Sequence, residues 1–364
     1  MKILTVVGAR PQFIKASAIS RALKTASEVD EISVHTGQHY DYGMSDVFFD
    51  ELDIPQPNYN LGIGSGGHGQ QTGKMLIAIE QVLLEEKPDK VVVYGDTNST
   101  LAGAIAAAKL HIPIAHVEAG LRSFNHQMPE EINRVLTDHA SDYLFAPTRS
   151  AVQQLTQEGV SLKKIFFVGD VMYDVALFFS RKAEQYSHIL KTLNLKSKKF
   201  CLATVHRAEN TDNSKRLKNI FDGLISLSKN YVVVLPLHPR TKKELERIDY
   251  MGKVQEAIRL IDPIGYLDMV KLEKNARLVL TDSGGIQKEA YFLGVPCVVL
   301  RNETEWMELV DLGWNVLSSP ERIDNFQETV RRHLSFNIGK LRHPQIYGNG
   351  NAASKILEIL KRND

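Results

Sequence analysis

The sequence has almost no excess of charge of either sign, since 44 lysines and arginines stand against 43 aspartates and glutamates, a formal net charge of +1. Binding to a polyanionic nucleic acid or an anionic membrane surface needs a positive excess, so the balance disfavours both partners. Long hydrophobic runs are also missing. The longest candidate, 101–108, is rich in alanine and far shorter than the roughly 18 apolar residues of a membrane span. We therefore expect a soluble protein with no nucleic acid and no membrane as partner.

Cysteine is scarce as well, with two residues in the chain, Cys201 and Cys297. Both stand in apolar runs without a cysteine or histidine at metal-site spacing, so the sequence predicts neither a disulfide framework nor a metal site. The first apolar run is interrupted by Arg10 and Pro11 and is too short for the core of a signal peptide. These features favour a cytoplasmic location.

Short apolar runs rich in valine and isoleucine recur along the chain, each followed by turn residues and a helix-like stretch. The expected strands are 2–8, 31–37, 90–96, 112–119, 142–148 and 164–170, then 199–206, 231–238, 257–262, 277–282, 296–300 and 315–319. This alternation predicts parallel sheets with crossover helices, and the nearly continuous apolar runs indicate that helices cover both faces of each sheet. The sequence therefore predicts an α/β fold of two Rossmann-like, doubly wound domains.

The strand runs fall into two sets, which places a domain boundary near Asp170. We expect an N-terminal domain over 1–170 and a C-terminal domain over 171–350. The helix-like segment 351–364 either completes the second domain or packs back on the first, and the glycine-rich stretch 62–69 is interpreted as a flexible loop.

Polar residues follow the expected strands of both halves. Ligands of open parallel sheets bind beyond the carboxyl ends of the strands, so these are the candidate site residues. In the first half they are mainly carboxylates, and in the second half histidine, arginine and a glycine-rich turn. We expect the active site in a cleft between the two domains.

The clearest anion site is the turn Ser283-Gly284-Gly285, which links a strand to a helix. The free N–H groups and the dipole at such a helix start favour a phosphate, and Glu289 farther along that helix is suited to a ribose diol. The alternative is a tight turn with a surface glutamate. The sequence has no GxGxxG after its first strand and no GxxxxGK[ST], so neither a nicotinamide nor a Walker fingerprint is present.

Carboxylates follow the strands at 90–96 and 112–119, and more of them open a later helix. Asp96 and Glu118 end these strands, while Glu130 and Glu131 follow Pro129 at the expected helix start. Clustered carboxylates raise the pKa of at least one member, which supplies an acid and a base near neutral pH. The alternatives are a turn role for Asp96 and, for the two glutamates, first-turn residues that complement the helix dipole, with Glu130 paired to Arg134.

Cationic residues complete the candidate set. Arg10 and Lys15 follow the first strand, where they can meet a phosphate or remain solvated charges. His206, next to Arg207, is a candidate general acid or a partner for a leaving phosphate, and His238 is a weaker candidate.

Seven segments carry a resemblance to a known family: GARPQFIK, VYGDTNSTLAGA, HVEAGLRS, MPEEINR, TVHRAEN, PLHPR and LTDSGGIQKEA. In this order and spacing they resemble the non-hydrolysing UDP-N-acetylglucosamine 2-epimerases over essentially the whole chain. The resemblance implies a glycosyltransferase-B-like fold, with the final helix crossing back to the first domain and UDP held mainly by the second. It also implies chemistry without a cofactor or metal, and a homodimer.

In the family a carboxylate removes the C2 proton while UDP leaves C1, which gives a 2-acetamidoglucal, and UDP then returns with protonation on the opposite face. Position by position, the resemblance gives acid/base roles to Asp96, Glu118 and Glu130 and makes His206 the catalytic histidine. The expected UDP-binding residues are Arg10, Lys15, Arg207, His238, Ser283, Gly284, Gly285 and Glu289. An allosteric UDP-sugar site in some members would involve Gln38 and Gln70.

Two departures from the family pattern concern the substrate. Gln12 stands where a glutamate is commoner, and the segment 40–52 differs from the usual basic, leucine-rich text. Both resemble the branch that acts on UDP-2,3-diacetamido-2,3-dideoxyglucuronate, and a neutral Gln12 would suit the extra carboxylate of that substrate. UDP-N-acetylglucosamine remains the other expected substrate. A glycosyltransferase of the same fold and a sugar-nucleotide-binding regulator are the rival functions.

Overall fold

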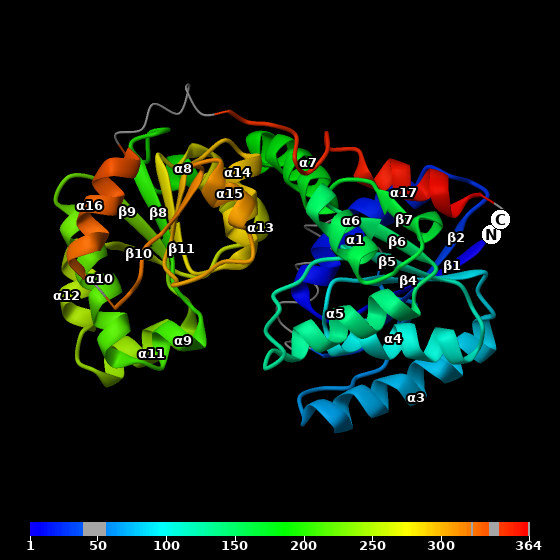
Figure 1. The fold of residues 1–364 in the computed structure, drawn as a ribbon. Coiled ribbons are helices and arrows are strands. Elements are labelled where there is room, and N and C mark those ends of the chain that lie inside the picture. Colours follow the sequence, from blue (N-terminus) through cyan, green and yellow to red (C-terminus); the bar gives the residue numbers. More distant parts are fainter. Residues whose placement is uncertain (39–55, 322, 335–341, 363–364) are drawn as a thin grey trace. The chain divides into compact units, whose positions relative to one another are not determined.

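The computed structural model describes residues 1–38, 56–321, 323–334 and 342–362 (Figure 1). The chain divides into two compact units, one formed by Met1–Val175 with Gln345–Asp364 and the other by Ala176–Pro344. Among the described residues, none of the helices is long and apolar enough to cross a bilayer.

The first unit is a parallel sheet with helices on both faces. Its strands are β1 (Lys2–Val7), β2 (Asp30–His35), β3 (Tyr59–Asn60), β4 (Lys90–Tyr94), β5 (Ile114–Val117), β6 (Tyr143–Ala146) and β7 (Ile165–Phe167). Its helices are α1 (Arg10–Lys24), α3 (His68–Glu86), α4 (Asn98–Lys109), α5 (Pro129–Ala140), α6 (Arg149–Gln157), the 3₁₀ turn η1 (Leu162–Lys164) and α17 (Ala352–Leu360), while α7 (Val171–Tyr186) begins here and ends in the second unit.

The strand order of this sheet is β3-β2-β1-β4-β5-β6-β7. Strands β2 and β3 are added on one side of β1 and strands β4 to β7 on its other side, so the order reverses between β1 and β4. Figure 1 shows α3, α4 and α5 together on one face of the sheet, and α17 packs against α1. The central strand β4 is buried along its whole length, which explains its unbroken apolar sequence. The point of reversal places the turns after β1 and β4 side by side, where ligands of such sheets bind.

The second unit repeats this architecture. Its strands are β8 (Phe200–Thr204), β9 (Val232–Pro236), β10 (Arg259–Ile261), β11 (Leu278–Thr281), β12 (Cys297–Val299) and β13 (Asn315–Leu317). Its helices are α8 (Ile189–Thr192), α9 (Ala208–Thr211), α10 (Ser214–Ser228), α11 (Pro239–Arg247), α12 (Met251–Ala257), α13 (Tyr266–Asn275), α14 (Gly284–Phe292), α15 (Met307–Asp311) and α16 (Ile323–Leu334).

The sheet of the second unit has the order β10-β9-β8-β11-β12-β13, again reversed after the third strand along the chain. One apolar cluster fills the space between the sheet and the α10, α12 and α16 side, and another lies on the α13 and α14 side. The turns after β8 and β11 therefore neighbour each other at the point of reversal. The predicted fold class, two Rossmann-like doubly wound domains, is confirmed.

Two local expectations differ from the structure. The strand β3 was not predicted, because it spans two residues, Tyr59–Asn60, and follows no apolar run. The stretch 62–69 is not loop throughout, since α3 begins at His68 with Gly67 as its N-cap.

The helix α17 belongs to the first unit and is anchored at both ends. At its start the Asp174 carboxylate accepts the N–H groups of Ala352 (3.1 Å) and Ala353 (2.8 Å). At its end the ammonium of the buried Lys90 donates to the carbonyl of Leu360 at 2.7 Å. Asp174 of α7 and Lys90 of β4 thus hydrogen-bond backbone groups that have no partner within the helix at its two termini.

Candidate active site

The turns after β4 and β5 bring a carboxylate and an ammonium together. Glu118 adopts a left-handed backbone with φ of 74°, and its N–H donates to the carbonyl of Phe145 at 3.2 Å. Its side chain is nearly buried and pairs with Lys15 of α1, an expected phosphate ligand. A Cβ built on Gly95 would lie 3.0 Å from Lys15 Nζ and 3.4 Å from a Glu118 oxygen, so the glycine leaves room for this pair.

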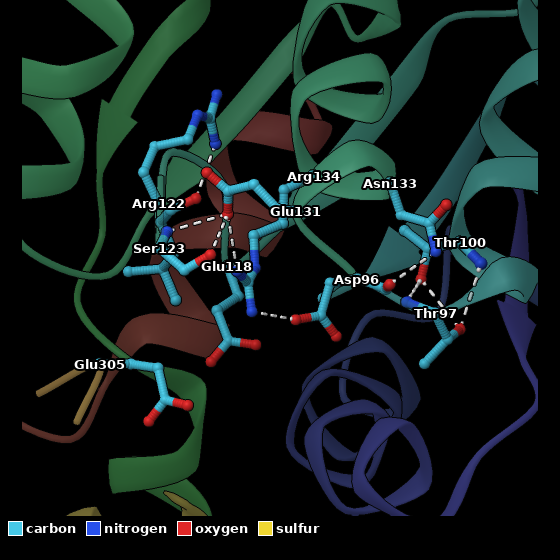
Figure 2. Close-up of polar contacts among 12 residues, drawn as sticks. Asp96, Thr97, Thr100, Glu118, Arg122, Ser123, Glu131, Asn133, Arg134 and Glu305 are labelled. Atoms are coloured by element: carbon cyan, nitrogen blue, oxygen red, sulfur yellow. Dashed lines mark hydrogen bonds and ion pairs between the residues drawn. The ribbon is translucent and has the colours of Figure 1, made fainter. Parts of the chain in front are cut away.

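Asp96 lies at the same edge and is held by the start of α5 (Figure 2). Arg134 bridges two carboxylates, with one nitrogen 2.6 Å from Asp96 and another 2.9 Å from Glu131. The expected alternative pairing of Glu130 with Arg134 is therefore wrong, and Glu130 is exposed on the first turn of α5. Arg134 was missed as a partner of Asp96 because 38 residues separate the two in sequence.

Glu131 is a structural anchor for the loop after β5. It is buried, and its carboxylate accepts the N–H groups of Ser123 (2.8 Å) and Phe124 (3.0 Å). Burial alone would raise the pKa of Glu131, but these hydrogen bonds and that from Arg134 outweigh it and lower the pKa. Glu131 is thus ionised and accepts these hydrogen bonds, whereas the neighbouring Glu130 is exposed.

Gln12 cannot serve substrate recognition in the expected way. Its side chain is 1% exposed, and its Oε1 accepts the N–H groups of Gly8 (2.8 Å) and Ala9 (3.0 Å). Its Nε2 donates to the carbonyl of Tyr94 and the hydroxyl of Thr100. All of these partners belong to the fold, so Gln12 offers nothing to an extra substrate carboxylate.

The remaining candidates of the first unit have separate settings. The Arg10 side chain, like the segment 40–52, lies outside the described residues, although Arg10 begins α1. Gln38 Oε1 accepts the Ser99 hydroxyl at 2.7 Å, which ties this candidate to the start of α4. Gln70 is exposed, next to the buried Gln71.

In the second unit, the buried Asp282 organises the turn after β8. Its carboxylate accepts the N–H groups of His206 (3.1 Å) and Arg207 (3.0 Å), and His206 Nδ1 lies 3.6 Å from it. The sequence shows Asp282 in the DSGG turn without a role. Its role follows from the pairing of β8 with β11, which places Thr204 opposite Thr281.

His238 lies close to His206, with 5.6 Å between the ring centres. Burial lowers the pKa of His238, and the positive charges of His206 and Arg240 lower it further. His238 also accepts the Arg240 N–H at 3.2 Å and so caps α11. Two expected site histidines are thus neighbours on adjacent strand ends.

The Ser283-Gly284-Gly285 turn opens α14, with Ser283 as N-cap. A Cβ on Gly284 would lie 3.7 Å from an Arg207 nitrogen, so this cation stands beside the helix start. Trp306 Nε1 donates to the carbonyl of Gly284 at 3.0 Å, and Glu305 lies 3.8 Å from Arg207. The expected anion site therefore has helix amides and a guanidinium together, and its support from Trp306 and Glu305 was not predicted.

Glu289 lies on α14, nearly buried, where the Tyr266 hydroxyl donates to its Oε1 at 2.7 Å. Behind it, Glu273 is fully buried with neither side-chain oxygen hydrogen-bonded within the described chain. Burial, with the nearby Glu289 charge, raises the pKa of Glu273 well above its ordinary value. Both carboxyl groups are thus buried side by side, and burial disfavours the charged form of Glu273.

The two units thus offer different chemistry. The first presents Asp96 and Glu118 at adjacent strand ends, each with a cationic partner that balances its charge. The second presents His206 and Arg207 beside a helix start, an arrangement suited to a phosphate. In the described part of the chain, histidine, cysteine and carboxylate side chains form no group of three or more that could hold a metal ion.

Comparison with known proteins identifies the family. The family model described as UDP-N-acetylglucosamine 2-epimerase matches residues 21–361. A Pseudomonas aeruginosa protein named UDP-2,3-diacetamido-2,3-dideoxy-D-glucuronate 2-epimerase is 54% identical, with 100% of both chains covered. A UDP-N-acetylglucosamine 2-epimerase of Methanocaldococcus jannaschii is 48% identical over 99% of both chains.

Solved structures agree with the sequence comparisons. The M. jannaschii UDP-GlcNAc 2-epimerase in complex with UDP-GlcNAc and UDP matches with a TM-score of 0.88 over 99% of both chains, at 48% identity. The Neisseria meningitidis enzyme bound to UDP-GlcNAc matches with a TM-score of 0.89 over 100% of both chains, at 32% identity. A Rickettsia africae glycosyltransferase, 14% identical with a TM-score of 0.61, shares the fold alone. The family predicted from the seven motifs is confirmed, and the chain belongs to the UDP-N-acetylglucosamine 2-epimerase family.

Proposed function

We propose that the protein is a non-hydrolysing UDP-sugar 2-epimerase, an isomerase that inverts C2 of a UDP-2-acetamido sugar for surface polysaccharide synthesis. The observation that carries this proposal is the placement of Asp96 and Glu118 at the ends of the paired strands β4 and β5, where Tyr94 lies opposite Val117. Removal and return of a proton at a single carbon require one carboxylate as base and one carboxylic acid as proton donor, and two carboxyl groups on one edge can supply both. The names of the family relatives support the same reaction class.

The proposed reaction begins with elimination. One carboxylate takes the C2 proton, the C1–O bond to UDP breaks, and its electron pair leaves with the diphosphate as the C1=C2 bond forms. In the return step a UDP oxygen attacks C1, and a carboxylic acid on the opposite face protonates C2. We assign Asp96, Glu118 and Glu130 as the general acid and base groups that remove and return this proton. The exposed position of Glu130 leaves its carboxylate open to a ligand.

Departure of UDP needs stabilisation of the charge that develops on the diphosphate. We assign this role to His206, Arg207, His238 and Arg10, to Lys15, and to the amides of Ser283, Gly284 and Gly285, with Glu289 on the ribose. The proximity of Arg207 to Gly284 supports the assignment. We propose that the substrate binds between the domains, the first of them 1–170 with 351–364 and the second 171–350.

Two substrates are compatible with this chemistry. The 54% identical P. aeruginosa relative favours UDP-2,3-diacetamido-2,3-dideoxyglucuronate, and the 48% identical M. jannaschii relative favours UDP-N-acetylglucosamine. Gln12 does not separate them, because its hydrogen bonds are made within the fold. We propose the diacetamido substrate first, and propose Gln38 and Gln70 as the place to look for an allosteric UDP-sugar.

We also propose a homodimer and a cytoplasmic location. The apolar side chains of Ile77 and Leu84 on α3 and of Ile132 and Leu136 on α5 are exposed, which suits contact with a second copy. Sedimentation equilibrium tests the dimer, and Leu84→Asp is the variant expected to weaken it. The free, buried thiols Cys201 and Cys297 suit a reducing compartment.

Incubation with each UDP-sugar in deuterated water, followed by proton NMR, tests the reaction. Deuterium at C2 together with a gluco/manno mixture is the expected result. Release of free sugar and UDP would indicate hydrolysis, and transfer to an added acceptor would indicate the glycosyltransferase. An unchanged spectrum with both substrates would overturn the proposal.

The variants Asp96→Asn and Glu118→Gln test the carboxylates, because each keeps the side-chain size and removes the base. We expect loss of C2 exchange with UDP binding largely preserved. Glu85→Gln, an exposed change on α3, is the matched control and should exchange like the wild type. Loss of UDP binding in both site variants would show that the two carboxylates bind the nucleotide instead.

A further inference from the structure

A buried histidine in β5 contacts the turn that precedes Asp96. His116 is the third residue of β5, and its side chain is 0% exposed. Its Nδ1 lies 2.6 Å from an oxygen of Asp138, and its Nε2 lies 2.8 Å from the carbonyl oxygen of Gly95. Both ring nitrogens are therefore engaged with oxygen atoms of the fold.

The partners of His116 fix which atoms carry hydrogen. A carbonyl oxygen only accepts, so the bond to Gly95 requires a hydrogen on Nε2. Asp138 is an acceptor too, because its other oxygen receives the N–H of Gly120 at 3.1 Å and lies 2.7 Å from Arg122 Nη1. Two bare acceptors at 2.6 Å would repel each other, so one hydrogen lies between Nδ1 and the Asp138 oxygen.

Asp138 is supported as a carboxylate by its surroundings. Burial opposes its ionisation, but the charges and hydrogen bonds of His116 and Arg122 outweigh burial and lower the pKa of Asp138. Arg122 in turn pairs with Glu158 at 2.7 Å. Asp138 thus lies between His116 and Arg122, and the buried Arg122 guanidinium lies between two carboxylates, Asp138 and Glu158.

These side chains hold the backbone on both sides of the candidate carboxylates. The carbonyl of Gly95 belongs to the peptide bond with Asp96, and the N–H of Gly120 follows Glu118 by two residues. The local backbone is left-handed at three points, with φ of 62° at Gly95, 74° at Glu118 and 82° at Gly120. Such conformations persist where surrounding bonds over-determine them, and His116 with Asp138 supplies two of those bonds.

We propose that His116 is a positioning residue for C2 epimerisation, which aims Asp96 through its Nε2–H bond to the Gly95 carbonyl. The inference rests on the proposed function, because it needs Asp96 and Glu118 to act on C2. His116 itself contacts no reacting atom, since both its nitrogens are engaged within the fold.

Two substitutions each keep one of the two hydrogen bonds of His116 and remove the other. The amide nitrogen of asparagine takes the place of Nδ1, so His116→Asn keeps a donor for Asp138 and leaves the Gly95 carbonyl without one. The amide nitrogen of glutamine takes the place of Nε2, so His116→Gln keeps the donor for Gly95. The two variants remove the same ring and each introduces a neutral amide, which makes them matched controls for each other.

We expect His116→Asn to lower the rate of C2 deuterium exchange by about 10- to 100-fold, because a small misplacement of a reacting group costs that much. The dissociation constant for UDP should stay within about threefold, since Asp96 is assigned to proton transfer rather than to binding. His116→Gln should exchange within a few-fold of wild type. The backbone amide NMR signal of Asp96 should shift in His116→Asn and hold its place in His116→Gln.

Equal exchange rates in the two variants, whether both normal or both low, would overturn the positioning role. If His116→Asn fails to fold, the glutamine variant decides alone, and a low rate in a folded His116→Gln refutes the proposal. A wild type that exchanges no deuterium refutes the proposed function itself. In that case the Asp96 amide signal still reports whether His116 sets the turn.

Discussion

At the scale of single residues, the sequence predicted which residues lie at the strand ends but not which residues they pair with. Lys15 and Glu118 were predicted as site residues, and the structure pairs them across 103 positions of sequence. Asp282 and Arg134 stood in quoted motifs without their roles, because those roles depend on turns that only the sheet brings near. A pattern read along the chain shows which residues are polar at a strand end, whereas hydrogen-bond partners come from neighbouring strands.

Gln12 illustrates the same point and gives a test of stability. Truncation in Gln12→Ala removes the acceptor for Gly8 and Ala9 and the donors to Tyr94 and Thr100, and all four partners are buried. We expect the free energy of unfolding to fall by about 2–4 kcal/mol, because each buried group left unpaired costs about 1–3 kcal/mol. Urea denaturation measures the change. The exposed Gln81→Ala on α3 should alter stability by less than about 0.5 kcal/mol.

At the scale of elements, the apolar runs predicted the strands almost completely, whereas only the family resemblance predicted the placement of the last helix on the first unit. The apolar spacing of 351–364 indicates a helix but is equally compatible with either unit. The structure decides through specific contacts, since α17 packs on α1 and takes its N-terminal hydrogen bonds from Asp174. Such a docking choice depends on partners far away in sequence, Asp174 in α7 and the surface of α1.

Asp174 therefore controls the start of α17. We expect Asp174→Ala to reduce the free energy of unfolding of the first unit by about 1–2 kcal/mol, the usual cost of a lost helix cap. Asp174→Asn keeps an acceptor oxygen and should lose less. Hydrogen exchange of the α17 amides, followed alongside urea denaturation, locates the effect. Unchanged protection in Asp174→Ala would contradict this role of the carboxylate.

The same residue predicts a dependence on pH. Burial raises the pKa of Asp174 above its ordinary value of 3.8, so the unfolded chain loses this proton at a lower pH than the folded chain does. Ionisation therefore favours the unfolded state increasingly as pH rises from 3.8 to the raised pKa. Over that interval the stability of the wild type relative to Asp174→Asn should fall with rising pH. If the stability of the wild type relative to Asp174→Asn stays constant or rises over this interval, the pKa of Asp174 is not raised in the folded protein.

At the scale of the whole molecule, each unit has its own sheet and its own apolar core. The repeated order of both sheets explains why composition and strand runs sufficed to predict two Rossmann-like domains. Local pattern could not assign 345–364 to the first unit, because this assignment depends on a return of the chain; only the family resemblance implied it, for the last helix.

Independence of the second unit is testable. A fragment of residues 176–344 keeps all six strands of its sheet, so we expect it to fold alone and to give dispersed amide NMR signals. A fragment of residues 1–175 lacks α17 and exposes the face of α1 that this helix covers. We expect that fragment to unfold at lower urea concentration than the full chain does. Equal stability of the first unit with and without α17 would disprove the dependence.

The return of α17 also orders events during synthesis. The strands of the first unit leave the ribosome before any of the second, yet the helix that covers α1 is made only after residues 176–344 have emerged. The first unit must therefore wait with an apolar surface open while the second is still being translated. A nascent chain paused in that interval should be a preferred client of chaperones that bind exposed apolar surface.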